Sequence, residues 1–151
     1  MTEIRCMQPE DLDQVAEIEK TCFSEPWSRE GFASSLRLPD TLYLAAEEEK
    51  QIVGYCGLLR SFEEADITNV AVREDCRNRG IAGKMLRELM RLGRESGIER
   101  FTLEVRVSNL SAIHLYEQLG FEAAGVRKNF YAKPTEDALI MWTGTPDRHF
   151  H

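Results

Sequence analysis

The 151-residue sequence has no long apolar run, and none of its runs approaches the roughly 20 residues of a membrane-spanning helix. Its first residues, Met1 to Arg5, lack the charged-then-apolar order of a signal peptide. Linkers rich in proline, glycine and serine are missing, as are internal repeats. We therefore expect a cytoplasmic protein that binds no membrane, with one domain over residues 1–144 and a short polar tail over 145–151.

The sequence also lacks the cysteine and histidine spacing of a metal site. Its four cysteines are scattered without a C-x-x-C pair, among apolar residues or at the ends of elements. A free cysteine is more often a small buried hydrophobe than a nucleophile, and no histidine is placed in sequence as its partner. We predict no disulfide and no metal, and we treat His114, His149 and His151 as non-catalytic.

Net positive charge is lacking too. The formal charge of -7 argues against binding to nucleic acid, since such domains normally present a basic face. Residues 73–106, however, hold nine arginines and lysines against six acids. That segment is able to attract a phosphorylated cofactor, although a solvated helix with mixed charges explains most of these residues equally well.

What is present is a pattern of short strands and amphipathic helices. Apolar runs and alternation predict strands over residues 3–7, 41–47, 51–61, 65–73, 101–107, 121–131 and 138–143. Helical periodicity follows Pro9, Ser28, Gly80 and Asn109, and the short helix after Ser28 is expected to carry Phe32, Leu36 and Leu38. We predict an α/β (α+β) domain of three layers, with a mixed, mostly antiparallel sheet of about seven strands and helices on both faces.

The strand at 67–72, the turn at 77–82 and the helix from Ile81 form one strand-turn-helix unit. Such a unit aims several backbone N–H groups at one point, and the start of a helix carries partial positive charge. Gly80 lets a phosphate approach the backbone where a side chain would collide with it. The turn lacks both the G-x-x-x-x-G-K-[ST] and the G-x-G-x-x-G patterns. The alternative is an ordinary helix that begins at a glycine after an arginine-rich turn.

Arg77-x-x-Gly80-x-Ala82 resembles the R/Q-x-x-G-x-G/A signature of the GNAT superfamily of N-acetyltransferases. The run Ser108-Asn109-x-x-Ala112-x-x-x-Tyr116-Glu117-x-x-Gly120-Phe121 is also typical of that family, and the resemblance extends over nearly the whole chain. It implies that acetyl-CoA is bound, with its pantetheine arm between two strands that splay apart, 65–73 and 100–107. The residues expected to bind it are Val70, Ala71, Val72, Arg77, Asn78, Arg79, Gly80, Ile81, Ala82, Gly83, Lys84 and Asn109.

The turn departs from the commonest form of this signature at two positions. Asn78 stands where a second basic residue is usual, and the missing positive charge is expected to weaken phosphate binding by about 1 kcal/mol. Ala82 stands where glycine is usual, and its methyl group is tolerated if the residue is already helical.

Acyl transfer to an amine needs a base, because an ammonium is not nucleophilic. Alternation along 101–107 turns Glu104 away from Leu103, Val105 and Val107, where a solvent-facing glutamate is the default. The resemblance implies that Glu104 accepts the proton, directly or through water, and that Tyr116 donates one to the sulfur of coenzyme A. Tyr116 also fits a core aromatic, and helix capping alone would explain Asn109.

Backbone N–H groups near Val70 to Val72 are expected to stabilise the oxyanion of the intermediate formed by direct attack in a ternary complex. The reaction requires no metal.

For the acceptor amine, the sequence is most similar to the RimI type of this family, the ribosomal-protein-alanine N-acetyltransferases. The similarity is carried by Phe23-Ser24-x-Pro26-Trp27-Ser28, by Leu103-Glu104-Val105-Arg106-x-Ser108-Asn109 and by Arg127-Lys128-Asn129-Phe130-Tyr131. It implies that Trp27 and Tyr131 flank a slot for the N-terminus of a small-subunit ribosomal protein. Trp27 also fits a plug between helices, and Tyr131 a strand-end aromatic.

Two other functions stay open on the sequence: acetylation of a small amine, and an idle module that only binds acetyl-CoA. We expect a monomer or a weak homodimer.

Overall fold

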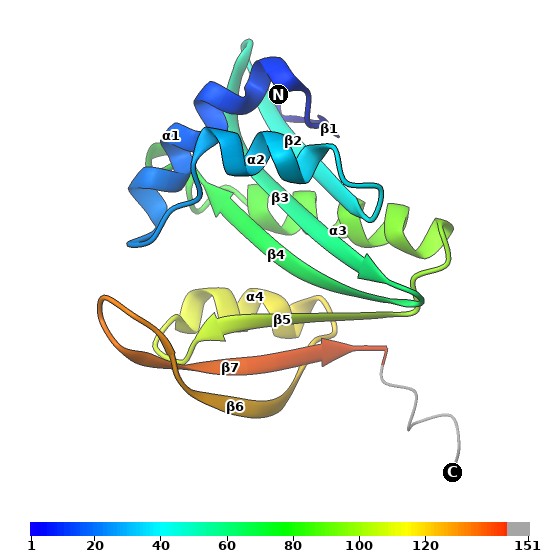
Figure 1. Ribbon diagram of the computed structural model, residues 1–151, viewed down its shortest axis with the longest axis vertical. Helices are drawn as coiled ribbons and strands as arrows, with labels where there is room; N and C mark the ends of the chain where they lie inside the picture. The colour runs from blue at the N-terminus through cyan, green and yellow to red at the C-terminus, as the bar shows by residue number, and fades with distance from the viewer. Residues whose placement is uncertain (145–151) are drawn as a thin grey trace.

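The computed structural model describes residues 1–144, which form a seven-stranded sheet covered by four α-helices (Figure 1). The strands are β1 (Glu3–Cys6), β2 (Thr41–Glu48), β3 (Gln51–Ser61), β4 (Glu64–Val72), β5 (Arg100–Arg106), β6 (Glu122–Tyr131) and β7 (Glu136–Thr143). The helices are α1 (Leu12–Cys22), α2 (Arg29–Leu36), α3 (Ile81–Glu95) and α4 (Leu110–Gln118). Residues 145–151, expected to be a polar tail, lie outside the described residues together with His149 and His151.

The strand order is β1-β2-β3-β4-β5-β7-β6, and β4 with β5 is the parallel pair among antiparallel neighbours. In Figure 1, α1 and α2 cover one face of the β1–β4 half, whereas α3 and α4 lie behind the sheet. The predicted three-layer α/β fold with a mixed, mostly antiparallel sheet is therefore confirmed.

Two apolar clusters hold these layers together. The larger one lies between the sheet and the pair α3 and α4, and it includes Met85, Leu89 and Phe101. The smaller one lies under α1 and α2, around Phe32 and Tyr55. Because both faces of β3 are covered, its middle residues are buried without alternation, as expected for a central strand.

Local capping signals place the starts of two helices. Ser28 caps α2 by accepting a hydrogen bond from the Gly31 N–H, and Asn109 caps α4 in the same way from the Ala112 N–H.

Two details of the sequence interpretation were wrong. Leu38, expected on the second helix, lies beyond its end at Leu36 and is exposed. Val107, expected to continue the alternation of the strand, follows its end at Arg106 and is also exposed. Both residues continue an apolar spacing, but the chain has already turned away from the core at these positions.

No helix among residues 1–144 is both long and apolar enough to cross a membrane.

Candidate active site

The site lies where β4 and β5 diverge. The two strands pair over Glu64 to Asp66 on β4 and Arg100 to Thr102 on β5, and no further. Beyond these residues they diverge, leaving the wedge visible at the centre of Figure 1. The predicted splay of the strands is confirmed. Since β4 still pairs with β3 on its other side, alternate backbone groups between Val70 and Val72 point into the wedge.

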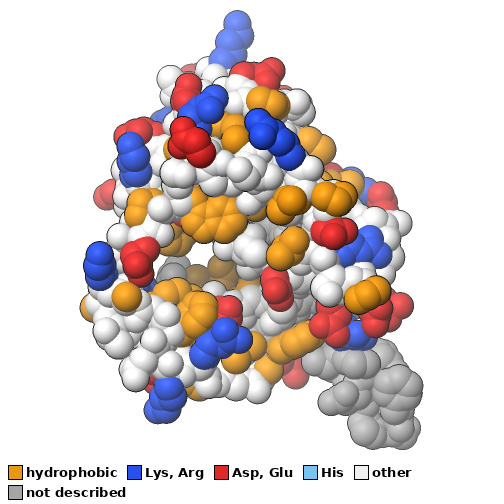
Figure 2. Space-filling view, viewed as in Figure 1, with side chains coloured by type: hydrophobic (Ala, Val, Ile, Leu, Met, Phe, Trp, Pro, Cys, Tyr) orange, Lys and Arg blue, Asp and Glu red, His pale blue; other side chains and the backbone are white. Residues whose placement is uncertain are grey.

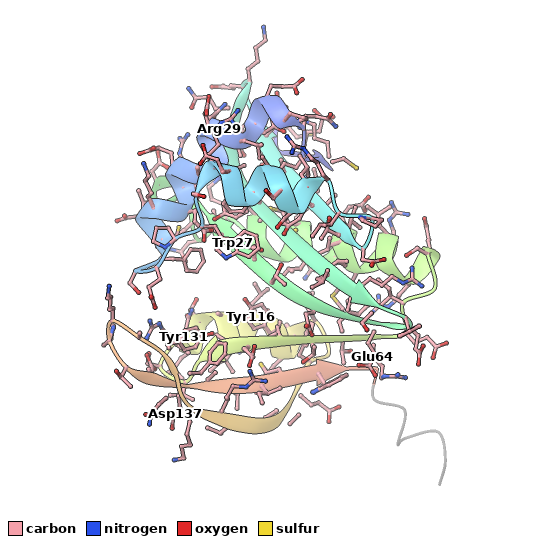
Figure 3. The ribbon with its side chains drawn as sticks, in the orientation of Figure 1. Trp27, Arg29, Glu64, Tyr116, Tyr131 and Asp137 are labelled. Carbon is pink, nitrogen blue, oxygen red and sulfur yellow. The ribbon has the colours of Figure 1, made fainter. Side chains whose placement is uncertain are left out.

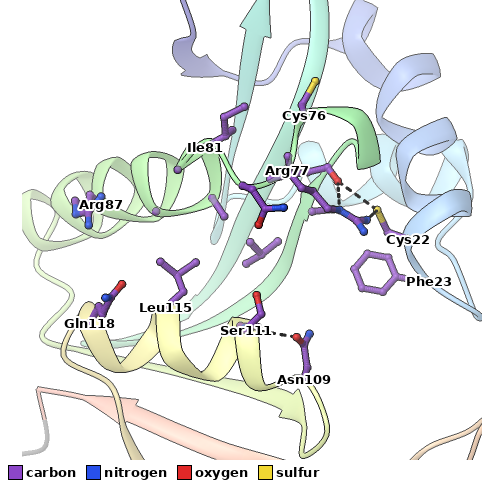
Figure 4. A pocket seen from close by; sticks show the side chains of 18 residues that line it. Cys22, Phe23, Cys76, Arg77, Ile81, Arg87, Asn109, Ser111, Leu115 and Gln118 are labelled. Atoms are coloured by element: carbon purple, nitrogen blue, oxygen red, sulfur yellow. Dashed lines mark hydrogen bonds between the residues drawn. The ribbon is translucent and has the colours of Figure 1, made fainter.

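A cleft of about 630 Å³ occupies the back of this wedge, between the start of α3 and one face of α4 (Figure 4). The space-filling view shows a hollow at the same level, between the upper and lower halves of the molecule (Figure 2). Most of the predicted cofactor-binding residues line the cleft: Val70, Ala71, Val72, Arg77, Asn78, Gly80, Ile81, Ala82, Gly83 and Asn109.

Arg79 and Lys84, which were predicted with that group, lie outside the lining of the cleft. The Arg79 guanidinium forms an ion pair with Glu48 at the end of β2. The Lys84 ammonium donates to the carbonyl of Thr2 at 2.8 Å. The side chains of both residues are therefore engaged by the β1–β2 edge of the sheet, on the other side of α3.

The turn before α3 bends through two residues with left-handed backbone, Asn78 with φ 64° and Gly80 with φ 77°. Asparagine adopts this region more easily than arginine or lysine, which gives the departure at position 78 a backbone reason. A Cβ atom at Gly80 would meet no heavy atom within 4 Å, so the turn borders open space. Ala82 is the second residue of α3, the helical position that its methyl group requires.

These features suit an anion. Gly80 has no side chain to cap α3, so the N–H groups of the first turn have no side-chain cap at the positive end of this 15-residue helix. Residues 80–83 line the cleft, which puts this helix start at its border. The Arg77 side chain lies beside them, with Nε donating to the carbonyl of Val72 at 3.1 Å and Nη2 to Cys22 Sγ at 3.1 Å (Figure 4).

Several lining residues were missed from the sequence. They come from the end of α1, from the turn before α3, from the second turn of α3 and from one face of α4: Cys22, Phe23, Cys76, Arg87, Ser111, Ala112, Leu115 and Gln118. The three-residue spacing of Asn109, Ala112 and Leu115 was a signal for the α4 face, because residues three apart lie on one side of a helix. Nothing local in the sequence links α1 to this cleft.

Glu104 lies on β5 between the buried Leu103 and Val105, and its side chain occupies the opposite face of the sheet. The alternation inferred from the sequence is confirmed. Arg127 Nε lies 3.0 Å from Glu104 Oε2, an ion pair whose angles do not make a hydrogen bond. Within residues 1–144, this buried oxygen accepts no hydrogen bond. The Glu104 carboxylate is thus held beside a cation, and its Oε2 keeps a lone pair that can accept a proton.

Tyr116 approaches from the other face of the sheet, on α4. It is 8% exposed, and its ring packs edge-on against Phe121 with centroids 5.9 Å apart. Burial raises the pKa of its hydroxyl to about 12, with smaller contributions from Tyr131 and Cys56. The phenol therefore stays protonated at neutral pH. The core role and the proton-donor role predicted for it are compatible.

Asn109 caps α4 and also lines the cleft, so its two predicted roles are both geometrically open. Its Oδ1 accepts the Ala112 N–H at 3.3 Å, which leaves its amide nitrogen for another partner.

Trp27 and Tyr131 lie on opposite sides of the wedge, above and below it in Figure 3. Trp27 belongs to the loop between α1 and α2, and Tyr131 ends β6. The α1–α2 loop meets the β6–β7 turn where Ser24 Oγ donates to the carbonyl of Ala132 at 3.5 Å. Burial raises the pKa of Tyr131, and the charge of Glu104 raises it further. The two aromatic residues thus bracket the mouth of the wedge on the Glu104 side.

The described part of the chain has no group of three or more histidine, cysteine or acidic side chains that could hold a metal ion. His114 on α4 is exposed, and its Nε2 lies 3.3 Å from the amide nitrogen of Gln118.

Comparisons with known proteins agree on the kind of site. The family model described as the acetyltransferase (GNAT) family matches residues 12–121. A putative [ribosomal protein bS18]-alanine N-acetyltransferase of Bacillus subtilis is 39% identical over 140 residues, covering 92% of this chain and 93% of the relative. The [ribosomal protein bS18]-alanine N-acetyltransferase of Escherichia coli K12 is 34% identical over 152 residues, covering 93% and 96%.

The fold agrees as well. The crystal structure of the ribosomal-protein-S18-alanine N-acetyltransferase from Escherichia coli superposes with a TM-score of 0.87 at 32% identity, covering 95% of this chain and 93% of that one.

Proposed function

The chain belongs to the GNAT family of acetyltransferases, and from this premise we propose that it acetylates the N-terminal alanine of a small-subunit ribosomal protein. It is an N-acetyltransferase that takes its acetyl group from acetyl-CoA. The relatives named for bS18 support ribosomal protein S18 as the acceptor, and a ribosomal substrate supports a cytoplasmic location for the reaction. This acceptor is favoured over a small amine and over an idle binding module.

The observation that carries the proposal is the divergence of β4 from β5 beyond Asp66. It opens one passage through the sheet, with the cleft at the start of α3 on one side and the mouth between Trp27 and Tyr131 on the other. A donor and an acceptor can enter from opposite faces and meet within it. This arrangement supports direct transfer in a ternary complex.

The residues that line the cleft fit acetyl-CoA. First-turn N–H groups of α3 would hold the pyrophosphate, and backbone groups from Val70 to Val72 would pair with the pantetheine amides. The apolar side of Leu115 and the cap residue Asn109 border the same channel.

Glu104 serves as the proton acceptor in this proposal. The substrate ammonium gives a proton to the Glu104 carboxylate, directly or through water, and the free amine then attacks the thioester carbonyl carbon. A new C–N bond forms, and backbone N–H groups of β4 stabilise the oxyanion that develops.

Tyr116 completes the transfer. When the C–S bond breaks, its hydroxyl gives a proton to the departing sulfur, and the newly bonded nitrogen releases its second proton to solvent. After coenzyme A leaves, the Tyr116 phenolate regains a proton from solvent and Glu104 releases the proton that it accepted. Glu104 and Tyr116 lie on opposite faces of β5, so the proton acceptor faces the incoming amine and the donor faces the outgoing thiol.

Incubation with acetyl-CoA and a peptide bearing the N-terminus of the ribosomal protein tests this function. The peptide should become about 42 Da heavier, which is one acetyl group. A matched peptide whose α-amine is already blocked should stay unchanged, and any gain in its mass would show acetylation of lysine side chains instead. If the free peptide gains no mass while a panel of polyamines, amino sugars or amino acids does, the acceptor is a small amine.

A further inference from the structure

One buried charge in the molecule has no part in the reaction described above. Glu19, on α1, is 3% exposed, although glutamate is almost never fully buried unless it is paired. It lies on the face of α1 that packs against the sheet, beside Val15 and Ile18. An apolar side chain would fill this place without the cost of burying a carboxylate, so the partners of Glu19 explain its presence.

Its two oxygens bind two different elements. Oε1 accepts a hydrogen bond from the hydroxyl of Tyr55, in the middle of β3. Oε2 accepts the backbone N–H of Trp27 at 3.0 Å. Tyr55 is fully buried, and burial followed by the Glu19 carboxylate raises the pKa of its hydroxyl, which keeps it a donor. The carboxylate therefore links the α1–α2 loop to the centre of the sheet.

The indole ring of Trp27 is held by the same cluster. It packs against Phe32 with ring centroids 5.2 Å apart, and Phe32 packs edge-on against Tyr55 at 5.6 Å. Backbone and ring are thus both fixed, through Glu19 and through Phe32, to one buried residue of β3. Trp27 still keeps 38% of its surface exposed and faces the wedge opposite Tyr131 (Figure 3).

We propose that Glu19 is a positioning residue that holds Trp27 as a fixed wall of the acceptor slot. The inference rests on the proposed function, because it takes this slot as the place where the peptide N-terminus binds. Glu19 acts through the Trp27 N–H and touches neither the acceptor nor the reacting atoms. A loop that is already fixed loses less conformational entropy when a peptide binds, so the effect falls on acceptor binding.

The first measurement is steady-state kinetics with the S18 N-terminal peptide. Glu19→Leu removes both acceptors and should raise KM for the peptide about tenfold, with KM for acetyl-CoA unchanged and kcat changed little. Glu19→Gln should restore near wild-type values, because the amide oxygen can accept from Trp27 while the amide nitrogen donates to Tyr55. Tyr55→Phe removes one of the two partners of Glu19 and should give a smaller rise in KM for the peptide. This variant replaces Glu19→Leu in the test if Glu19→Leu does not fold.

Asp11→Leu is the matched control. Asp11 is a second buried carboxylate just before α1, 6% exposed and paired with Arg5, at the opposite end of the helix from Trp27. Its loss should destabilise the fold as much as the loss of Glu19. It should leave KM for the peptide at the wild-type value.

The second measurement needs no substrate. With Trp142→Phe as background, Trp27 is the one remaining tryptophan of the chain, and its emission reports on the loop. Glu19→Leu should make this emission more accessible to acrylamide quenching, whereas Glu19→Gln and Asp11→Leu should not.

The outcomes separate the two proposals. Wild-type quenching of Trp27 in Glu19→Leu would overturn the positioning role, and so would increased quenching with an unchanged KM for the peptide. A rise in KM for the peptide that Asp11→Leu reproduces would reduce Glu19 to a stabilising residue. A wild-type enzyme that never acetylates the peptide would instead contradict the proposed acceptor, while the quenching result would still report on how Trp27 is held.

Discussion

At the scale of single residues, the two proposed proton carriers differ in what surrounds them. Glu104 sits on an open sheet face beside Arg127, and its Oε2 accepts no hydrogen bond within the described chain. Tyr116 is buried in the larger apolar cluster. A carboxylate with a free lone pair can take a proton, whereas a buried phenol stays neutral and can give one.

Glu104→Gln tests the proton acceptor. The amide keeps the shape of the side chain but cannot take a proton, so kcat should fall about 100-fold or more while KM for acetyl-CoA changes little. Asp66→Asn is the control, because Asp66 lies on the adjacent strand and also interacts with Arg127. Unchanged kcat in Glu104→Gln, measured by release of coenzyme A, would remove Glu104 from the mechanism.

Tyr116→Phe tests the proton donor. Loss of the hydroxyl should lower kcat about 10-fold or more, since the leaving thiolate then takes its proton from water. The pKa of about 12 also predicts a pH dependence. The phenol is protonated below this value, so its titration should cause no loss of rate as the pH rises from about 7 to about 10. A decline of kcat over that range that is absent from the Tyr116→Phe variant would contradict this assignment.

At the scale of elements, one arginine organises the turn between β6 and β7. Arg106, at the end of β5, donates to the carbonyls of Pro134 at 2.9 Å and Ala132 at 3.2 Å, and it pairs with Glu136 at 3.1 Å. Its guanidinium also lies 4.5 Å from the centre of the Tyr131 ring. These contacts fix the side of the acceptor mouth that faces Trp27.

Arg106→Lys tests that role. A lysine cannot reproduce the fork of hydrogen bonds or the stacking on Tyr131, so KM for the peptide should rise about fivefold, the equivalent of about 1 kcal/mol. Arg100→Lys is the matched control, because Arg100 begins the same strand and pairs with Glu63 and Glu64 away from the cleft. Equal KM values for the two variants would show that the β6–β7 turn does not need this anchor.

At the scale of the whole molecule, the passage between β4 and β5 is an opening in the middle of the sheet. The larger apolar cluster has members on both strands, such as Ile67 and Val105, so the halves stay joined through α3 and α4 while backbone pairing is absent. A ligand that enters the passage therefore contacts both halves of the molecule.

Bound acetyl-CoA should consequently stabilise the fold. At about 100 times its Kd, it should raise the free energy of unfolding by about 2.7 kcal/mol, which thermal or denaturant unfolding measures. Acetyl-pantetheine at the same concentration lacks the pyrophosphate that α3 is proposed to hold, and it should give a smaller shift. Equal shifts from both compounds would mean that the turn at 77–82 contributes nothing to binding.

The sequence by itself determined much of the fold and the centre of the site. Alternation around Glu104, the caps at Ser28 and Asn109 and the glycine before α3 are local signals, because each depends on the backbone geometry of a few neighbouring residues. Those signals, with the family resemblance, were sufficient for the fold class and for acetyl-CoA. The roles of individual site residues stay predictions.

Only the tertiary structure decided which distant residues share the site. Whether Arg79 and Lys84 face the cleft or the β1–β2 edge depends on partners such as Glu48 and Thr2, far away in the chain. The link from Tyr55 through Glu19 to Trp27 likewise joins β3, α1 and a loop. No periodicity records such contacts, because they arise from the packing of elements whose separation in sequence is unrelated to their distance in space.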